Sequence, residues 1–197
     1  KRYLASGAIN YIPDFAWSNL PFTMEMLWTL AIGMHSVELA QLLNTSIGIM
    51  ILFWMIKFCN KINLSFENTF ISIVLFYSIT TVSELSQSGM VELGSTLFFI
   101  SATYLLIMES NNNYNYTIIV GVLFGLFCST KIPFIFITML IIFFYTYKNF
   151  KIEKNINYVF KKSFIFSTTI LLVAGVWFLK SFIMTGNPIF PLLNNFF

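Results

Sequence analysis

Long runs of apolar residues, separated by short polar breaks, recur along the whole chain. A membrane-spanning helix needs about 20 mostly apolar residues, and six runs approach that length. They cover residues 37–57, 68–83, 89–108, 115–130, 132–147 and 163–182. Because the runs are repeated, none is typical of a removable signal peptide, which is a single short run near the start of a chain. The pattern predicts an all-α, polytopic helical membrane protein.

Two stretches leave the number of helices open. Residues 20–34 are apolar but contain Pro21 and Glu25, so they form either a seventh span or a helix in the membrane interface, which we favour. Residues 115–147 could form one long helix, but Lys131 and Pro133 interrupt the run, and proline suits the first turn of a new helix. We therefore expect a hairpin of two helices there, and six to seven transmembrane or interfacial helices in all.

Composition agrees with this class of protein. Apolar residues make up 57% of the chain, charged residues only 10%, and the mean hydropathy is +0.79, beyond what a soluble domain needs. We expect one transmembrane domain over residues 1–197: an outer-face loop and interfacial helix (1–36), a bundle (37–182) and an outer-face tail (183–197). The net charge of +3, without a basic stripe and interleaved aromatics, argues against nucleic-acid binding.

Lysines indicate which ends of the predicted helices face the cytoplasm, where Lys and Arg are enriched. Two basic clusters, separated by four predicted spans, consist of Lys57 and Lys61 and of Lys148, Lys151, Lys154, Lys161 and Lys162. Four crossings return the chain to the same side, whereas a single helix over 115–147 would put the clusters on opposite sides. Both clusters are then cytoplasmic, and the loop 83–89, the turn around Lys131 and the tail after Lys180 face outside.

Four charged residues gather at this predicted outer face, namely Glu84, Glu92, Lys131 and Lys180. A charge near the membrane is costly unless it is paired or faces a water-filled cavity, so these are candidate site residues. Structural roles stay open: Glu92 suits the positive end of a helix dipole, and Lys180 can extend to the headgroups. Asp14 joins the same face if residues 20–34 do not span.

Metal and redox chemistry have little support in the sequence. Cys59 and Cys128 have no CxxC pattern and lie at the ends of apolar runs, so we interpret them as packing residues. His35 is the single histidine, and no second imidazole is present to share a metal with it. The residues identify no certain cofactor.

Four motifs occur in order along the chain. They are Y-x-P-D-x-x-x-S-N-x-P-x-x-M-E-M-L (11–27), G-M-V-E-L (89–93), G-x-x-x-G-L-x-x-S-T-K (121–131) and W-F-L-K-S-F-I-M-T-G-N-P-I-F-P (177–191). In this order they resemble the bacterial integral membrane glycosyltransferases of the GT-C fold, similar to the protein O-mannosyltransferase and aminoarabinose transferase families. The resemblance covers nearly the whole chain, and T-G-N-P-x-x-P is its most distinctive piece.

The resemblance implies transfer of a sugar from a polyprenyl-phosphate carrier to a lipid, glycan or protein acceptor, on the outer face of a bacterial cytoplasmic membrane. In that family a carboxylate in the first outer loop is the general base, and a second acid begins a later helix, sometimes with a divalent metal. Glu92 matches the second acid, where the family more often has Asp. The first acid would precede Lys1, so we expect a fragment lacking the first transmembrane helix, with Asp14 as the nearest substitute.

The chemistry of such a transfer requires acidic and basic residues, as found at the predicted outer face. A base must deprotonate the acceptor hydroxyl, and positive charge must stabilise the departing phosphate. The candidates are, for catalysis, Glu92, Asp14 and Glu84, and, for substrate binding, Lys131, Lys180, Tyr11 and Asn187. Both lysines would contact phosphate. Tyr11 belongs to an amphipathic stretch near the lipid donor, and Asn187 forms either a turn that closes the cavity or a simple Asn-Pro turn.

Other classes of function stay open. A transporter or lipid flippase would also place charges in a polar cavity, but near the membrane midplane and commonly in two similar halves, and no internal repeat is visible. A structural or assembly subunit without chemistry is a third reading. A membrane-embedded ligase or polymerase of surface polysaccharide is the closest enzymatic competitor, and the sequence separates it poorly from a transferase.

Overall fold

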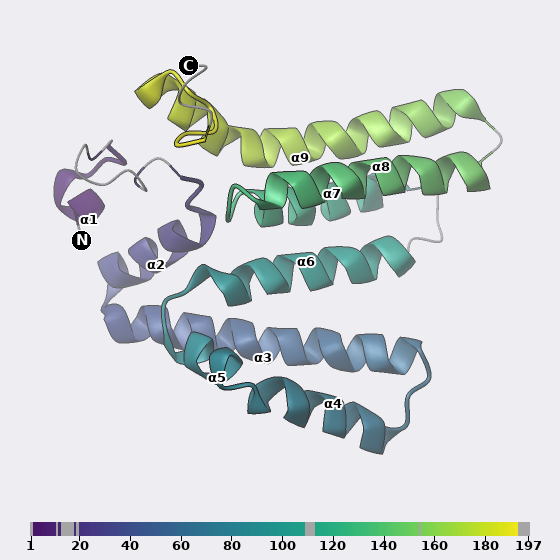
Figure 1. Ribbon diagram of the computed structural model, residues 1–197, viewed down its shortest axis with the longest axis horizontal. Coiled ribbons are helices and arrows are strands. Elements are labelled where there is room, and N and C mark those ends of the chain that lie inside the picture. The colour runs from purple at the N-terminus through teal and green to yellow at the C-terminus, as the bar shows by residue number, and fades with distance from the viewer. Residues whose placement is uncertain are drawn as a thin grey trace. The chain divides into compact units, whose positions relative to one another are not determined.

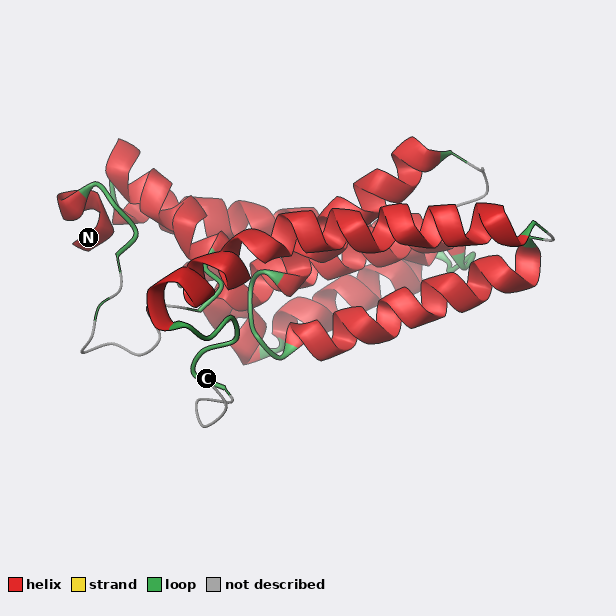
Figure 2. Cartoon of the chain, turned by 90° about the horizontal axis from the view of Figure 1, so that it is seen from above, coloured by secondary structure: helices red, strands yellow, loops and turns green. Residues whose placement is uncertain are grey.

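The computed structural model describes residues 2–10, 12, 18, 20–108, 113–153 and 155–192 (Figure 1). Among these residues there are helices and loops but no strand (Figure 2). The helices are α1 (Arg2–Ser6), α2 (Thr23–Met34), α3 (Val37–Lys61), α4 (Phe66–Ser78), α5 (Thr80–Gln87), α6 (Val91–Met108), α7 (Tyr114–Cys128), α8 (Phe134–Ile152) and α9 (Ile156–Thr185). The all-α prediction is therefore confirmed.

Four of the described helices, α3, α6, α8 and α9, are long and apolar enough to cross a membrane, and the bent pair of α4 and α5 can count as a fifth. The apolar helix α7 has 15 residues, which correspond to about 22 Å. With 12 residues, or about 18 Å, α2 is shorter than a bilayer core, which favours its interfacial placement. These lengths indicate an integral membrane protein, and the number of six to seven helices in or on the membrane stays a prediction.

Polar residues mark where several helices begin. The hydroxyl of Ser36 accepts the N–H of Leu39 at the start of α3, and the hydroxyl of Ser65 accepts the N–H of Asn68 at the start of α4. The side chains of Asn113 and Asn155 do the same for α7 and α9. Each supplies an acceptor to an N–H group that has no partner inside its helix, so the polar breaks between apolar runs fix the helix starts.

The predicted hairpin over 115–147 is confirmed. Helix α7 ends at Cys128 and α8 begins at Phe134. Pro133 occupies the position before the first residue of α8, where its missing N–H costs no helical hydrogen bond. The N–H of Phe134 donates to the carbonyl of Lys131 at 3.1 Å, which closes the turn.

One expectation from the sequence is corrected by the structure. Residues 68–83 do not form a continuous helix, because α4 ends at Ser78 and α5 is bent away from it by 70°. Residues 83–89 are not simply a loop either, since α5 runs to Gln87. Ile79 has extended backbone between the two helices, and the β-branched run from Ile79 to Val82 weakens helix propensity at this point. Glu84 therefore lies on a short helix.

The chain divides into two compact units. Unit 1 comprises Lys1–Ala8 and Met24–Ile107, and unit 2 comprises Ile9–Thr23 and Met108–Phe197. In unit 1 a buried cluster joins α2, α3 and α6; its members include Met24, Trp28, Ala31, Ile47, Ile51, Leu93 and Leu97. Gly94 on α6 leaves room for Met24, because a Cβ at Gly94 would collide with that side chain.

Unit 2 is built on three long helices. Gly121 faces Thr169 and Gly125 faces Val173, an advance of four residues on each helix, so α7 and α9 run in the same direction. Helix α8 packs beside them and runs in the opposite direction, since the hydroxyl of Thr117 near the start of α7 lies 3.1 Å from that of Tyr145 near the end of α8. One end of the unit therefore holds the α7–α8 turn and the end of α9.

Candidate functional site

The acidic candidates that the structure describes belong to unit 1. Glu84 is exposed on α5. Glu92 is half-buried in the first turn of α6, where a carboxylate is stabilised by the helix dipole. Its backbone carbonyl accepts the hydroxyls of Ser95 and Thr96, both at 2.8 Å. Of these acids, Glu92 has the more enclosed position.

A further carboxylate lies in the first turn of α2. Glu25 is half-buried, and its backbone carbonyl accepts the hydroxyl of Thr29 at 2.7 Å. Burial raises the pKa of Tyr3, and the nearby negative charge of Glu25 raises that pKa further. Glu25 therefore lies close enough to Tyr3 to interact with it.

The break between α4 and α5 is stabilised by a residue that the sequence analysis does not single out. Asn44 of α3 is fully buried, and its side-chain amide donates to the carbonyls of Leu85 and Ser88 at the end of α5. The adjacent Thr45 donates to the carbonyl of Ser86 at 3.0 Å. Polar residues inside an apolar run, N-T-S at 44–46, were the available signal, because such groups need a partner in the membrane.

A cavity of about 530 Å³ lies beside this break. Its walls come from α3, α4 and α5, and its polar members are all hydroxyls; the lining residues are Thr45, Ile49, Leu52, Ile73, Val74, Tyr77, Ser78 and Ser86. The lining carries no charge, so this cavity suits a neutral group and offers neither a base nor a cation for phosphate.

The basic candidates belong to unit 2. Lys180, near the end of α9, donates from Nζ to the backbone carbonyl of Ser18 at 2.9 Å and lies over the rings of Phe22 and Trp177. Lys131 is half-buried in the turn between α7 and α8. Both lysines are at the end of the unit that holds this turn and the end of α9, as the outer-face prediction requires of this pair.

Asn187 organises the turn that follows α9. It is 1% exposed, its Oδ1 accepts the N–H of Ile189 at 3.0 Å, and its Nδ2 donates to the carbonyl of Leu192 at 2.6 Å. Gly186 before it adopts a left-handed conformation at φ 76°, which ends the helix. These bonds show that Asn187 stabilises a turn, and its role in closing a substrate cavity stays a prediction.

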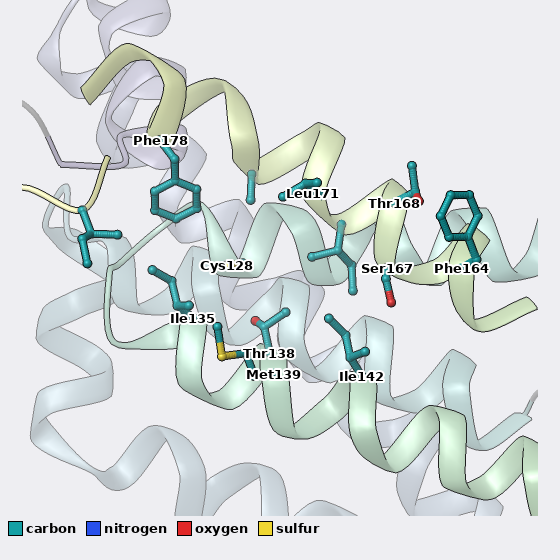
Figure 3. Close-up of a pocket in the computed structure, with 13 residues that line it drawn as sticks. Cys128, Ile135, Thr138, Met139, Ile142, Phe164, Ser167, Thr168, Leu171 and Phe178 are labelled. Carbon is teal, nitrogen blue, oxygen red and sulfur yellow. The ribbon is translucent and has the colours of Figure 1, made fainter. Parts of the chain in front are cut away.

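A long apolar groove runs between α8 and α9 in unit 2 (Figure 3). The cavity has a volume of about 460 Å³. Ile135 and Phe178 stand at one end and Ile142 and Phe164 at the other. Its walls also include Cys128, Thr138, Met139, Ser167, Thr168, Ile170, Leu171, Ala174 and Ile189. Since no charged residue lines it, the groove suits a hydrocarbon chain.

One lysine of the cluster that the sequence predicts to be cytoplasmic is buried. Lys162 is 3% exposed inside unit 2, and its ammonium lies 5.9 Å from the ring centroid of Tyr145 and 6.0 Å from that of Tyr158. Helix α9 starts at Ile156, so Lys162 belongs to a helix and not to a loop. Its spacing from the buried Val159 and Phe166 could have indicated that it points inward.

Two candidates, Asp14 and Tyr11, lie outside the described residues. The acids that are described belong to unit 1 and the lysines to unit 2, so their union in one site stays a prediction. Within the described ranges no group of three or more His, Cys, Asp or Glu side chains could hold a metal ion.

Comparison with protein-family models, with curated proteins and with solved structures finds no match to this chain. The resemblance to GT-C glycosyltransferases therefore stays a prediction from the motifs.

Proposed function

We propose that this protein is a membrane glycosyltransferase that moves a sugar from a polyprenyl-phosphate carrier to an acceptor at the outer face of a bacterial cytoplasmic membrane. One observation carries the proposal: in unit 2 an uncharged groove between two long apolar helices ends beside a turn that contains a lysine. A substrate with a hydrocarbon chain and an anionic head matches both features.

The groove is long enough for such a chain. Phe164 and Phe178, at its two ends, are 14 positions apart on α9, which corresponds to about 21 Å along the helix. The lining is almost entirely apolar, and both flanking helices can cross a membrane, so the groove opens to hydrocarbon. An isoprenoid chain would bury its surface there without desolvating a charge.

Lys131 supplies the complementary charge for the phosphate. It lies in the turn between α7 and α8, four residues before Ile135, which lines the groove. An ammonium group near the leaving phosphate stabilises the charge that develops as the sugar is transferred. Glu92 is the preferred base for the acceptor hydroxyl, because its half-buried position at a helix start is more suited to catalysis than the exposed position of Glu84.

A groove-filling substitution tests this proposal. Met139 lines the groove but is 60% exposed, so a tryptophan there fills the groove without overpacking the interior. We expect Met139→Trp in the full-length protein to lower transfer from a polyprenyl-phosphate sugar by about tenfold. Leu140→Trp is the matched control, since Leu140 is 68% exposed and does not line the groove. Equal activities of the two variants would contradict a role for the groove.

One observation favours the alternative, a transporter or lipid flippase. The 70° break between α4 and α5, beside a hydroxyl-lined cavity, is the kind of discontinuous helix found in transporters. Reconstitution of the full-length protein into proteoliposomes separates the two functions. Movement of intact lipid-linked sugar across the bilayer, without transfer to any acceptor, would support the alternative and contradict the transferase.

A further inference from the structure

Lys180 binds the segment from Ser18 to Thr23 to helix α9 at two points, within unit 2. Its Nζ donates a hydrogen bond of 2.9 Å to the backbone carbonyl of Ser18. The same ammonium lies 5.0 Å from the ring centroid of Phe22 and 5.6 Å from that of Trp177. An aromatic face attracts a cation at such distances, so one lysine binds the segment at Ser18 and again at Phe22.

A chain of hydroxyl hydrogen bonds secures the end of the same segment. Nε1 of Trp177 donates to Oγ1 of Thr23 at 2.9 Å, and that hydroxyl donates to Oγ of Ser129 at 2.6 Å. Oγ of Ser129 in turn donates to the carbonyl of Leu126 at 2.8 Å. Each hydroxyl is therefore both a donor and an acceptor, and the chain of bonds joins α9 through Thr23 to α7.

The segment is buried where it is held. Ser18 is fully buried, and Phe22 is 9% exposed. The hydroxyl of Ser18 also accepts the N–H of Ile12 at 3.1 Å. Ser18, whose carbonyl accepts from Lys180, therefore also binds the backbone at Ile12, six residues earlier.

Lys180 faces away from the groove. The groove residues of α9 are spaced by three and four positions, as in Leu171, Ala174 and Phe178, and so lie on one side of the helix. Lys180 follows Phe178 by two positions, a rotation of about 200°, which directs it to the opposite side. A phosphate at the mouth of the groove would therefore meet Lys131 before Lys180.

We infer that Lys180 is a positioning residue, which holds residues 18–23 against the ends of α7 and α9, and not a ligand of the substrate phosphate. This replaces the role that the sequence predicts for it. The inference rests on the proposed function only for its effect on turnover, because the hold on residues 18–23 can be measured without any substrate.

Hydrogen–deuterium exchange of the full-length protein tests directly whether Lys180 holds residues 18–23 in place. Lys180→Met keeps an unbranched apolar stem but removes the charge and the donor, so exchange in the peptide covering residues 18–23 should rise about tenfold. Lys180→Arg retains a cationic donor and should restore slow exchange to within about threefold. Lys161→Met is the matched control, since Lys161 is an exposed lysine of the same helix, and it should leave this peptide unchanged.

A general loss of folding is separated from a local loss by two further measurements. Exchange in α6 and α8 should stay as in the wild type when Lys180 is replaced. If Lys180→Met raises exchange in every helix, Thr23→Val breaks the hydroxyl chain instead and should raise exchange in residues 18–23 alone. Unchanged exchange of that segment in both variants would overturn the inference.

Kinetics with a polyprenyl-phosphate sugar distinguish positioning from phosphate binding. Lys180→Met should lower kcat about tenfold and leave the KM for the donor within about twofold. A KM raised about tenfold or more, with unchanged exchange, would overturn the inference in favour of a phosphate contact. If the wild-type protein transfers sugar from no donor, the proposed function fails, while the exchange measurement still decides on the role of Lys180.

Discussion

The two units hold their helices together in different ways. In unit 2, α7 and α9 are unbroken helices that approach at Gly121 and Gly125, where a Cβ on Gly125 would lie only 3.2 Å from the carbonyl oxygen of Ile170. In unit 1, α5 follows a break and is bound by side chains of α3, in which Asn44 and Thr45 donate to backbone carbonyls. The α7–α9 contact depends on small residues, and the α3–α5 contact depends on polar ones.

The difference follows from whether each helix leaves backbone groups without a hydrogen-bond partner. Apolar helices gain little from hiding their surface from lipid, so α7 and α9 associate through close packing, which glycine permits. A broken helix exposes backbone carbonyls that have no partner in hydrocarbon, so α5 requires donors from a neighbour. The stability of the α7–α9 contact should therefore depend on side-chain volume. That of the α3–α5 contact should depend on the hydrogen-bond donors of α3.

The largest effect is expected at the α7–α9 contact. Gly125→Leu should destabilise unit 2 by about 3 kcal/mol, because the new side chain meets backbone that cannot move aside. Gly175→Leu, also within unit 2, is the matched control: no atom lies within 4 Å of the Cβ position at Gly175. Thermal unfolding in detergent should show a lower midpoint for the first variant only. Similar midpoints for both would mean that close approach does not hold these helices.

A smaller effect is expected at the junction of α3 and α5. Asn44→Leu keeps a similar volume but leaves the carbonyls of Leu85 and Ser88 without their donor, at a cost of about 2 kcal/mol. Ser46→Ala is the control, since Ser46 is exposed and donates within its own helix to Leu42. Hydrogen exchange should accelerate in residues 80–88 in the first variant. Protection that survives Asn44→Leu would show that α5 is held by packing instead.

The smallest effect is expected at the hydroxyl chain in unit 2. Thr23→Val removes the hydroxyl that links Trp177 to Ser129 and should cost about 1 kcal/mol. Thr23→Ser preserves that hydroxyl and should restore stability in the same unfolding measurement. A loss as large as that of Gly125→Leu would erase the contrast between a unit held by packing and one held by polar contacts.

The apolar runs and the polar breaks between them predicted most of the helices. The start of α3 at Val37 and the Lys131–Pro133 turn could be predicted, because polar breaks and proline act over a few residues. The break at Ile79 was not, since the apolar run continues through it and the bend depends on donors from Asn44 in another helix. The polar residues at 44–46 indicate that α3 needs hydrogen-bond partners, but they do not indicate that these partners lie at the end of α5.

The candidate site was predictable in residue type but not in contacts. The sequence placed Lys131 and Lys180 at one end of the helices, where the structure also has them within unit 2. It did not reveal that Lys180 binds the carbonyl of Ser18, which is 162 positions away. The groove was equally hidden, because its wall combines two helix faces whose residues are as apolar as their lipid-facing neighbours.

Sugar transfer by the Glu92→Gln variant tests the central claim most directly. The full-length protein and its Glu92→Gln and Glu84→Gln variants would be reconstituted and supplied with radiolabelled polyprenyl-phosphate sugars. We expect transfer by the wild type, a loss of at least about tenfold in Glu92→Gln, and a change of less than about twofold in Glu84→Gln, whose carboxylate is exposed. Wild-type transfer that is undiminished in Glu92→Gln would contradict the role of Glu92, and no transfer from any donor would contradict the glycosyltransferase itself.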